Sequence, residues 1–120
     1  MDQTEITKTI GNYELVQRRN DGFVNATYLT EQFNRANNEN RMVKEFLNTD
    51  EAQSIIRELT GSYMDQDNGK FFEQSDSGGI WIHPGLILHF AKWIDARLEL
   101  EVIKWFHKAK KEDIKTIFNH

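Results

Sequence analysis

The chain has 120 residues, 38% of them hydrophobic, a formal net charge of −4 and no cysteine. This length suits one domain with one compact core. The lack of cysteine excludes a disulfide framework and a thiolate metal site, and the negative charge argues against indiscriminate adhesion to nucleic acid. No apolar run approaches the roughly 20 residues of a membrane helix, and residues 1–5 lack the basic start and apolar run of a signal peptide. We therefore expect an intracellular protein that does not enter a membrane.

The N-terminal segment predicts a hairpin. Residues 1–9 are polar and are expected to be loosely ordered. Residues 10–19 alternate in the manner of a strand. The turn signal Asn-Asp-Gly at residues 20–22 folds this strand back onto the short strand at residues 23–24.

Two helices and a polar break follow the hairpin. Asn25 is placed to cap a helix over residues 26–36. Residues 37–40 are rich in asparagine, which competes with the helix for backbone hydrogen bonds and favours a turn. A second short helix is predicted over residues 41–47. The apolar faces of the two helices carry Ala26, Leu29, Phe33 and Ala36, and Met42, Val43, Phe46 and Leu47.

A third helix and a second hairpin come next. Thr49 is a suitable cap for the helix, and Gly61 is expected to end it. Residues 71–72 predict a strand that pairs with the strand at residues 80–82 across a polar loop, which would form a wing. The buried face of the helix is predicted to carry Ala52, Ile55, Ile56 and Leu59.

The C-terminal part predicts two more helices. Pro84 suits the first position of a helix over residues 84–97, which is apolar nearly all round and therefore central. The next helix begins near Leu98 and continues as an amphipathic extension. Its predicted inward residues are Leu98, Val102, Trp105 and Phe106. The predicted core comprises Leu15, Phe23, Leu29, Phe33, Phe46, Ile55, Leu59, Trp81, Leu88, Ala91, Trp93, Val102 and Trp105.

The helices at residues 26–36 and 41–47, with the break between them, form a helix-turn-helix-like pair. Such a pair can place its second helix in the major groove of DNA. Arginine and lysine can pair with guanine, and asparagine matches the edge of adenine. All three side chains can also hold phosphates. The same pattern also fits a solvated helix face beside an asparagine-rich turn. The candidate DNA contacts are Asn38, Asn40, Arg41, Lys44 and Asn48.

Charge is distributed unevenly along the chain. Residues 92–120 carry seven basic and five acidic groups, whereas residues 61–91 carry one and four. In the wing the acidic side chains would repel phosphates, and only Lys70, a further candidate DNA contact, offsets them. The basic tail contacts phosphates, complements the negative end of its own helix or only solvates that helix. Its candidate contacts are Lys104, Lys108, Lys110 and Lys111.

The sequence shows no pattern for catalysis or for a metal. His83 and His89 are six residues apart, which is not the i, i+4 spacing of a helical zinc pair. His83 is expected to satisfy the start of a helix or to pack beside the strand. The acidic loop at residues 65–76 lacks the final glutamate of a calcium loop. No nucleophile–base pair can be picked out. We therefore expect a protein that is not an enzyme and that uses no cofactor and no metal.

Two separated motifs resemble the hallmarks of one family. The first is Asp-Gly-Phe-Val-Asn-Ala-Thr at residues 21–27, and the second is Gly-Gly-Ile-Trp-Ile-His-Pro at residues 78–84. Ala-Lys-Trp-Ile at 91–94 and Val-Ile-Lys-Trp at 102–105 follow. The order and spacing of these motifs make most of the chain similar to the KilA-N domain. The resemblance implies an α+β fold related to the fungal APSES domain, which is a winged helix-turn-helix relative. It also implies DNA binding, usually as the N-terminal module of a larger phage or viral protein.

The predicted fold class is thus α+β, with a small antiparallel sheet from two β-hairpins and about four to five helices. The domain is expected over residues 10–107, with a helical extension or the start of a linker over 108–120. The leading function is a non-enzymatic DNA-binding module of a phage or large DNA virus protein. Helix 41–48 would read duplex DNA, and the basic C-terminal helix would contact phosphates.

The alternative function is a protein-interaction module. It would bind a host or phage regulator through the acidic wing or the apolar tail. The oligomeric state stays open, because the tail residues Ile114, Ile117 and Phe118 allow a homodimer through the C-terminal helix or packing against the domain.

Overall fold

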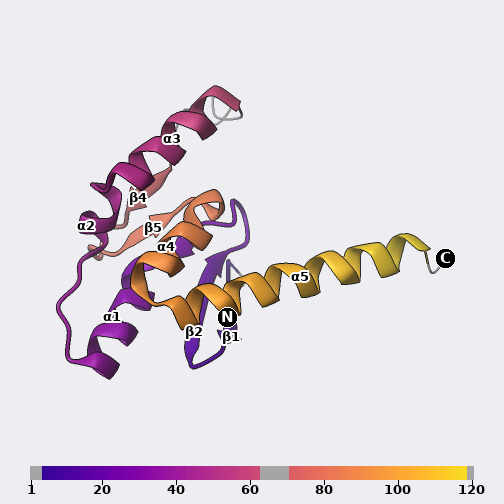
Figure 1. The fold of residues 1–120 in the computed structure, drawn as a ribbon, viewed down its shortest axis with the longest axis horizontal. Coiled ribbons are helices and arrows are strands. Elements are labelled where there is room, and N and C mark those ends of the chain that lie inside the picture. The colour runs from indigo at the N-terminus through magenta and orange to yellow at the C-terminus, as the bar shows by residue number, and fades with distance from the viewer. Residues whose placement is uncertain (1–3, 63–70, 119–120) are drawn as a thin grey trace.

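The computed structural model describes residues 4–62 and 71–118, with the side chains of residues 60–62 and 109–118 excepted. It confirms the α+β class (Figure 1). Five strands form one antiparallel sheet in the order β1-β2-β3-β5-β4. The strands are β1 (Glu5–Ile10), β2 (Tyr13–Arg18), β3 (Val24–Asn25), β4 (Phe72–Gln74) and β5 (Ile80–Ile82). Both predicted hairpins, β2–β3 and β4–β5, are present.

Strand β1 corrects the expectation of loose order for residues 5–9, and residues 1–3 lie outside the described residues. It pairs with β2 over its whole length, from Glu5 opposite Arg18 to Ile10 opposite Tyr13. Gly11 begins the two-residue turn between the strands with a φ of 59°, a conformation that glycine adopts without strain. The polar composition was misleading because an edge strand buries only one face, and alternate threonines and charges suit the other.

Five α-helices and a 3₁₀ turn accompany the sheet in the described residues. They are α1 (Ala26–Asn37), α2 (Val43–Leu47), α3 (Asp50–Ser62), η2 (Pro84–Leu86), α4 (Ile87–Ile94) and α5 (Ala96–Phe118). Asn25 Oδ1 accepts a hydrogen bond from the Tyr28 N–H at 3.0 Å, and Thr49 Oγ1 accepts one from the Ala52 N–H at 3.1 Å. Both predicted caps are therefore confirmed.

Three helix boundaries differ from the prediction. Helix α2 begins at Val43 rather than at residue 41, and α3 continues through Gly61 instead of ending there. The helix predicted over residues 84–97 is divided at Asp95, whose backbone is extended. Asp95 Oδ1 accepts a hydrogen bond from the Arg97 N–H at 3.0 Å, so this residue ends α4 and caps α5.

Helix α5 is continuous from Ala96 to Phe118. Figure 1 shows it leaving the body of the domain toward the C-terminus. The predicted homodimer contacts Ile114, Ile117 and Phe118 have side chains outside the described set, so that interface stays a prediction. Within the described residues, no helix is both long and apolar enough to cross a membrane.

The two hallmark motifs lie side by side in the sheet. Val24 pairs with Ile82 and Asn25 pairs with Trp81. The Thr27 hydroxyl accepts a hydrogen bond from the Ile80 N–H at 2.8 Å. Segments some fifty residues apart in the sequence therefore form the centre of one sheet, and α1 and the 3₁₀ turn start directly from it.

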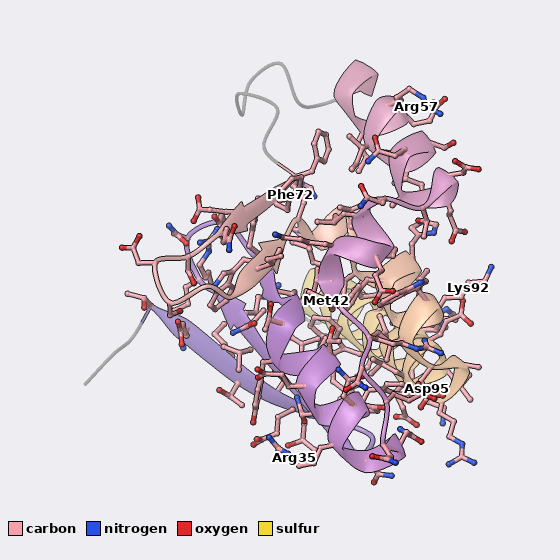
Figure 2. All side chains as sticks on the ribbon, turned by 90° about the vertical axis from the view of Figure 1, so that its left-hand side faces the viewer. Arg35, Met42, Arg57, Phe72, Lys92 and Asp95 are labelled. Atoms are coloured by element: carbon pink, nitrogen blue, oxygen red, sulfur yellow. The ribbon has the colours of Figure 1, made fainter. Side chains whose placement is uncertain are left out.

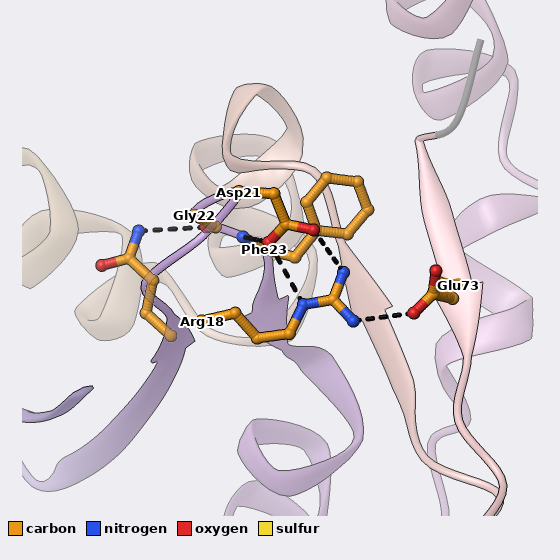
Figure 3. A network of polar contacts seen from close by, with 6 residues as sticks. Arg18, Asp21, Gly22, Phe23 and Glu73 are labelled. Atoms are coloured by element: carbon orange, nitrogen blue, oxygen red, sulfur yellow. Dashed lines mark hydrogen bonds and ion pairs between the residues drawn. The ribbon is translucent and has the colours of Figure 1, made fainter. Parts of the chain in front are cut away.

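Arg18 ties the first hairpin to the wing (Figure 3). Its guanidinium forms ion pairs with Asp21 and Glu73, each at 2.7 Å. It also lies over the rings of Phe23 and Trp81, 4.9 and 5.2 Å from their centres. Because Glu73 is paired in this way, the wing presents less negative charge than its sequence indicates.

The core lies between the sheet and the helices. Of the predicted members, eight are buried: Leu15, Phe23, Leu29, Phe33, Phe46, Trp81, Ala91 and Val102. Ile55, Leu59, Leu88, Trp93 and Trp105 are partly buried and pack against it. Three residues that were placed on apolar faces are instead exposed, namely Ala36, Met42 and Phe106. Met42 lies before α2 rather than within it, which explains why it does not follow that helix's stripe.

Candidate nucleic-acid interface

The segment that joins α1 to α2 is held rigidly at both ends. Asn38 closes α1 in the left-handed conformation, with a φ of 54°, and its N–H bonds to the Asn34 carbonyl. Asparagine adopts this conformation more readily than most residues. The Asn34 side chain then holds the Arg41 backbone, donating to its carbonyl at 2.9 Å and accepting from its N–H at 3.0 Å. Asn38 and Asn40 are both left exposed.

Arg41 has a structural role that the sequence analysis did not predict. Its Nη1 donates to the carbonyls of Trp93 and Ile94, at 2.5 and 2.9 Å, at the C-terminal end of α4. The guanidinium also lies over the Phe33 and Trp93 rings, 4.8 and 5.4 Å from their centres. A cation in this position complements the negative end of the helix dipole. Arg41 therefore fixes the segment to the core, and its charge is directed inward.

Helix α2 has one buried and one exposed face. Val43, Phe46 and Leu47 are buried, whereas Lys44 and Asn48 are exposed and follow each other at i, i+4 spacing. Glu45, which also lies on the outer side, accepts a hydrogen bond from the Met42 N–H at 2.7 Å. This carboxylate thus stabilises the start of α2, in the manner of a capping box.

Figure 2 looks onto this side of the domain. Met42 lies near its centre, and 59% of the residue is exposed. Arg35, Lys92 and Arg57, from α1, α4 and α3, lie toward the edges of the view. All three cations are exposed. We call the surface formed by Asn38, Asn40, Met42, Lys44 and Asn48 the α2 face.

Helices α2 and α3 are joined by only two residues, Asn48 and Thr49. The Gln53 side chain donates to the Leu47 carbonyl at 2.7 Å and reinforces the turn. In the helix-turn-helix-like pair predicted from residues 26–36 and 41–47, residues 38–42 separate α1 from α2. The exposed side of α3 carries Arg57 together with acidic residues, so its charge is mixed.

The predicted lysines of α5 lie on another side. Lys104 and Lys108 are exposed, and Lys104 is 3.5 Å from Glu101. When the α2 face is turned toward the viewer, α5 lies behind the body of the domain (Figures 1 and 2). The structure therefore does not bring the two predicted sets of DNA contacts onto one face. Lys110 and Lys111 lie on α5 with undescribed side chains, and Lys70 lies outside the described residues.

Lys8 belongs with the α5 lysines, although sequence reasoning did not find it. Its Nζ lies 4.6 Å from the centre of the Trp105 ring. Lys8, Lys104 and Lys108 line one groove between β1 and α5. No local signal in the sequence could connect Lys8 with residues nearly one hundred positions away.

In the part of the chain that the structure describes, no cluster of side chains could hold a metal ion. His83 Nδ1 accepts a hydrogen bond from the Gly85 N–H at 2.9 Å, and its ring packs against Phe23 and Phe71. His83 therefore satisfies the start of the 3₁₀ turn, as the sequence analysis expected. His89 lies 3.8 Å from Glu51 on α3.

The fold and this surface define a small α+β domain in which a short helix presents polar and cationic groups beside a β-hairpin. The family model of the KilA-N domain matches residues 8–112, which is most of the chain. The protein belongs to the KilA-N domain family, which is generally a DNA-binding, non-enzymatic family. No curated protein and no solved structure matches the chain.

Proposed function

We propose that this domain binds duplex DNA without catalysis, as a module of a phage or large DNA virus protein, and that the α2 face reads the DNA. The observation that carries the proposal is that, on this surface of a KilA-N domain, some side chains support the backbone while others are exposed to a ligand. Arg41 and Glu45 hold the backbone in place, while Lys44 and Asn48 project outward from it. Side chains that read base edges need such rigid support.

The chemistry of the exposed groups suits DNA. Lysine can bond to guanine or to a phosphate, and asparagine matches the donor and acceptor edge of adenine. Helix α2 has five residues, so it spans only about 7.5 Å and reaches few base pairs. Phosphate contacts from Arg35, Arg57 and Lys92 at the edges would set its position, because backbone contacts orient a protein on the duplex.

The order of elements supports a winged helix-turn-helix arrangement. The pair α2–α3 is followed in the chain by the β4–β5 hairpin, the predicted wing. The Arg18–Glu73 ion pair lowers the negative charge of that hairpin and so its repulsion of phosphates. Arg41 has a supporting role in this proposal, and the α5 lysines are left out of it because they lie on another side.

The test is binding of a fluorescein-labelled random duplex, measured by anisotropy at several salt concentrations. Each phosphate contact contributes a slope of about −0.9 in log K against log salt. Lys44→Gln should weaken binding and, if Lys44 contacts a phosphate, flatten the slope by about this amount. The matched control is Lys108→Gln, another exposed lysine on a helix, which should bind as the wild type does.

The opposite pattern would contradict the proposed face. If Lys108→Gln weakens binding and Lys44→Gln does not, the duplex lies on the α5 side. If the wild-type protein does not bind duplex even at low salt, the DNA-binding proposal itself fails.

A further inference from the structure

Strand β1 lies at one edge of the sheet that the described strands form. The sheet order begins with β1, and its single neighbour among the described strands is β2. In Figure 2 it is the indigo strand along the outer border of the sheet, at the lower left. An edge strand leaves every second residue with its N–H and C=O directed away from the sheet, ready to pair with another strand.

The register identifies which backbone groups are free. The Arg19 N–H bonds to the Thr4 carbonyl at 2.8 Å, which makes these two residues a hydrogen-bonded pair. By alternation, Ile6, Lys8 and Ile10 bond toward β2. The backbone groups of Glu5, Thr7 and Thr9 therefore point outward, and all three residues are exposed.

A cationic groove follows the same strand. It has a volume of about 530 Å³ and is bounded by residues 8–11 on one side and by α5 on the other. Helix α5 contributes Glu101, Lys104, Trp105 and Lys108, which share one helix face at i, i+3, i+4 and i+7 spacing. Together with Lys8, the groove carries three lysines and one glutamate.

One end of the groove is closed by close packing. A Cβ at Gly11 would lie 2.8 Å from Glu101 Cγ, so α5 rests directly on the β1–β2 turn. Farther along, Lys8 lies over Trp105. Residues 11 and 8 thus meet residues 101 and 105, which means that α5 runs antiparallel to β1. The helix and the strand edge form a channel with a defined direction.

We propose that this channel binds an extended acidic peptide segment of a partner protein, which pairs with β1 as a sixth strand. The spacing of the lysines supports this choice. Lys104 and Lys108 are four residues apart on a helix, or about 6 Å along its axis. Alternate side chains of an extended strand are about 6.6 Å apart. Acidic residues at every second position of the peptide therefore match the lysine repeat.

The groove fits a peptide better than a nucleic acid. The outward groups of β1 include both N–H donors and C=O acceptors, and a peptide strand supplies the complement of each. A phosphate backbone supplies acceptors but leaves the carbonyls of Glu5, Thr7 and Thr9 without donors. The site is independent of the α2 face, so a partner could bind here while DNA is bound there.

The test uses the full chain and a fluorescein-labelled octapeptide of alternating glutamate and threonine, with binding read by anisotropy. Two N-methylated forms of this peptide serve as probes, one methylated at every glutamate nitrogen and the other at every threonine nitrogen. In a paired strand only one of these sets of N–H groups faces β1. One isomer should therefore lose binding by about tenfold or more while the other retains it.

Protein variants locate the site. Lys104→Glu combined with Lys108→Glu should weaken peptide binding by about tenfold, whereas the control Lys44→Glu should leave it unchanged. Thr7→Pro removes one outward N–H and should also weaken binding, while Thr7→Val, which keeps the N–H, should not. Proline is tolerated at an edge position whose N–H faces solvent, and unchanged circular dichroism would confirm that the variants fold.

Three outcomes would overturn the proposal. The first is no binding of the octapeptide up to about 1 mM, the range of a weak complex. The second is equal binding of both N-methylated isomers, which would show charge attraction without strand pairing. The third is that the variant with both Lys104→Glu and Lys108→Glu binds duplex DNA more weakly but binds the peptide as the wild type does. That result would assign the groove to nucleic acid.

Discussion

The α2 face and the β1–α5 groove both present lysines, but they are supported differently. Behind Lys44 the inner side of α2 is fully buried, and Arg41 bonds the preceding segment to α4. Beside Lys104 and Lys108 the neighbouring Trp105 is only partly buried, and a groove and a free strand edge remain. A helix packed rigidly on the core suits the reading of DNA, whereas an open groove beside a strand edge suits the binding of an extended peptide segment.

The largest expected effect is on stability, and it compares an aromatic residue behind the α2 face with one beside the β1–α5 groove. Phe46 is fully buried, with its ring centre 5.2 Å from that of Phe90. Phe46→Ala should lower the free energy of unfolding by about 3–5 kcal/mol, through lost burial and the cavity left behind. Trp105→Ala should cost clearly less, because this side chain already borders the groove. Urea denaturation measures both. Equal losses would show that the two sides are supported alike.

A smaller difference in stability is expected between substitutions of the two cations near the α2 face, Arg41 and Lys44. Arg41→Ala removes hydrogen bonds from a charged donor to two carbonyls and should cost about 2 kcal/mol. Lys44→Ala, at an exposed position, should change stability by less than about 0.5 kcal/mol. Arg41→Lys should not restore the loss, because lysine lacks the planar fork that bonds and stacks at once. Thermal melts measure these losses. Equal losses of stability for Lys44→Ala and Arg41→Ala would contradict the structural role of Arg41.

The smallest effect concerns the junction of the β1–β2 hairpin with α5. Tyr13 donates a hydrogen bond to Asp95 Oδ2 at 3.3 Å. Burial, followed by the charge and the hydrogen bond of Asp95, raises the pKa of Tyr13 from 10.0 to about 12. The folded state therefore keeps this proton where the unfolded chain loses it. The resulting stability is fully present below pH 10 and is lost as the pH rises through about 12.

Tyr13→Phe tests that junction. The variant should show a shallower decline of unfolding free energy above pH 10 than the wild type, by less than about 1 kcal/mol, because solvent screens the half-exposed phenol. Guanidinium titrations at a series of pH values give the two curves. Parallel curves would mean that folding does not raise the pKa of Tyr13.

Local signals predicted much of the fold. The Asn-Asp-Gly turn, the Asn25 and Thr49 caps and the strand at residues 80–82 each depend on a few neighbouring residues, and the structure confirms all of them. Strand β1 was missed because its pairing with β2 and its packing on α5 compensate for a polar composition. Gly61 failed as a stop signal because glycine only weakens a helix and does not end it.

The candidate sites were predicted less well. Exposure was foreseen for Lys44 and Asn48, whose helical spacing places them opposite a buried stripe. The inward direction of Arg41 and the place of Lys8 over Trp105 depend on partners some fifty and one hundred residues away. Single-sequence patterns carry no information about such pairs.

The sequence by itself determined the family, the α+β class and most helix starts, because motif order, hydrophobic period and capping are properties of neighbouring residues. Only the tertiary structure decided which charges are available to a ligand. Lys44 and Arg41 are three positions apart with the same charge, yet one is exposed and the other bonds to the end of α4. A side chain's freedom depends on which acceptors the fold brings near it, and these come from distant parts of the chain.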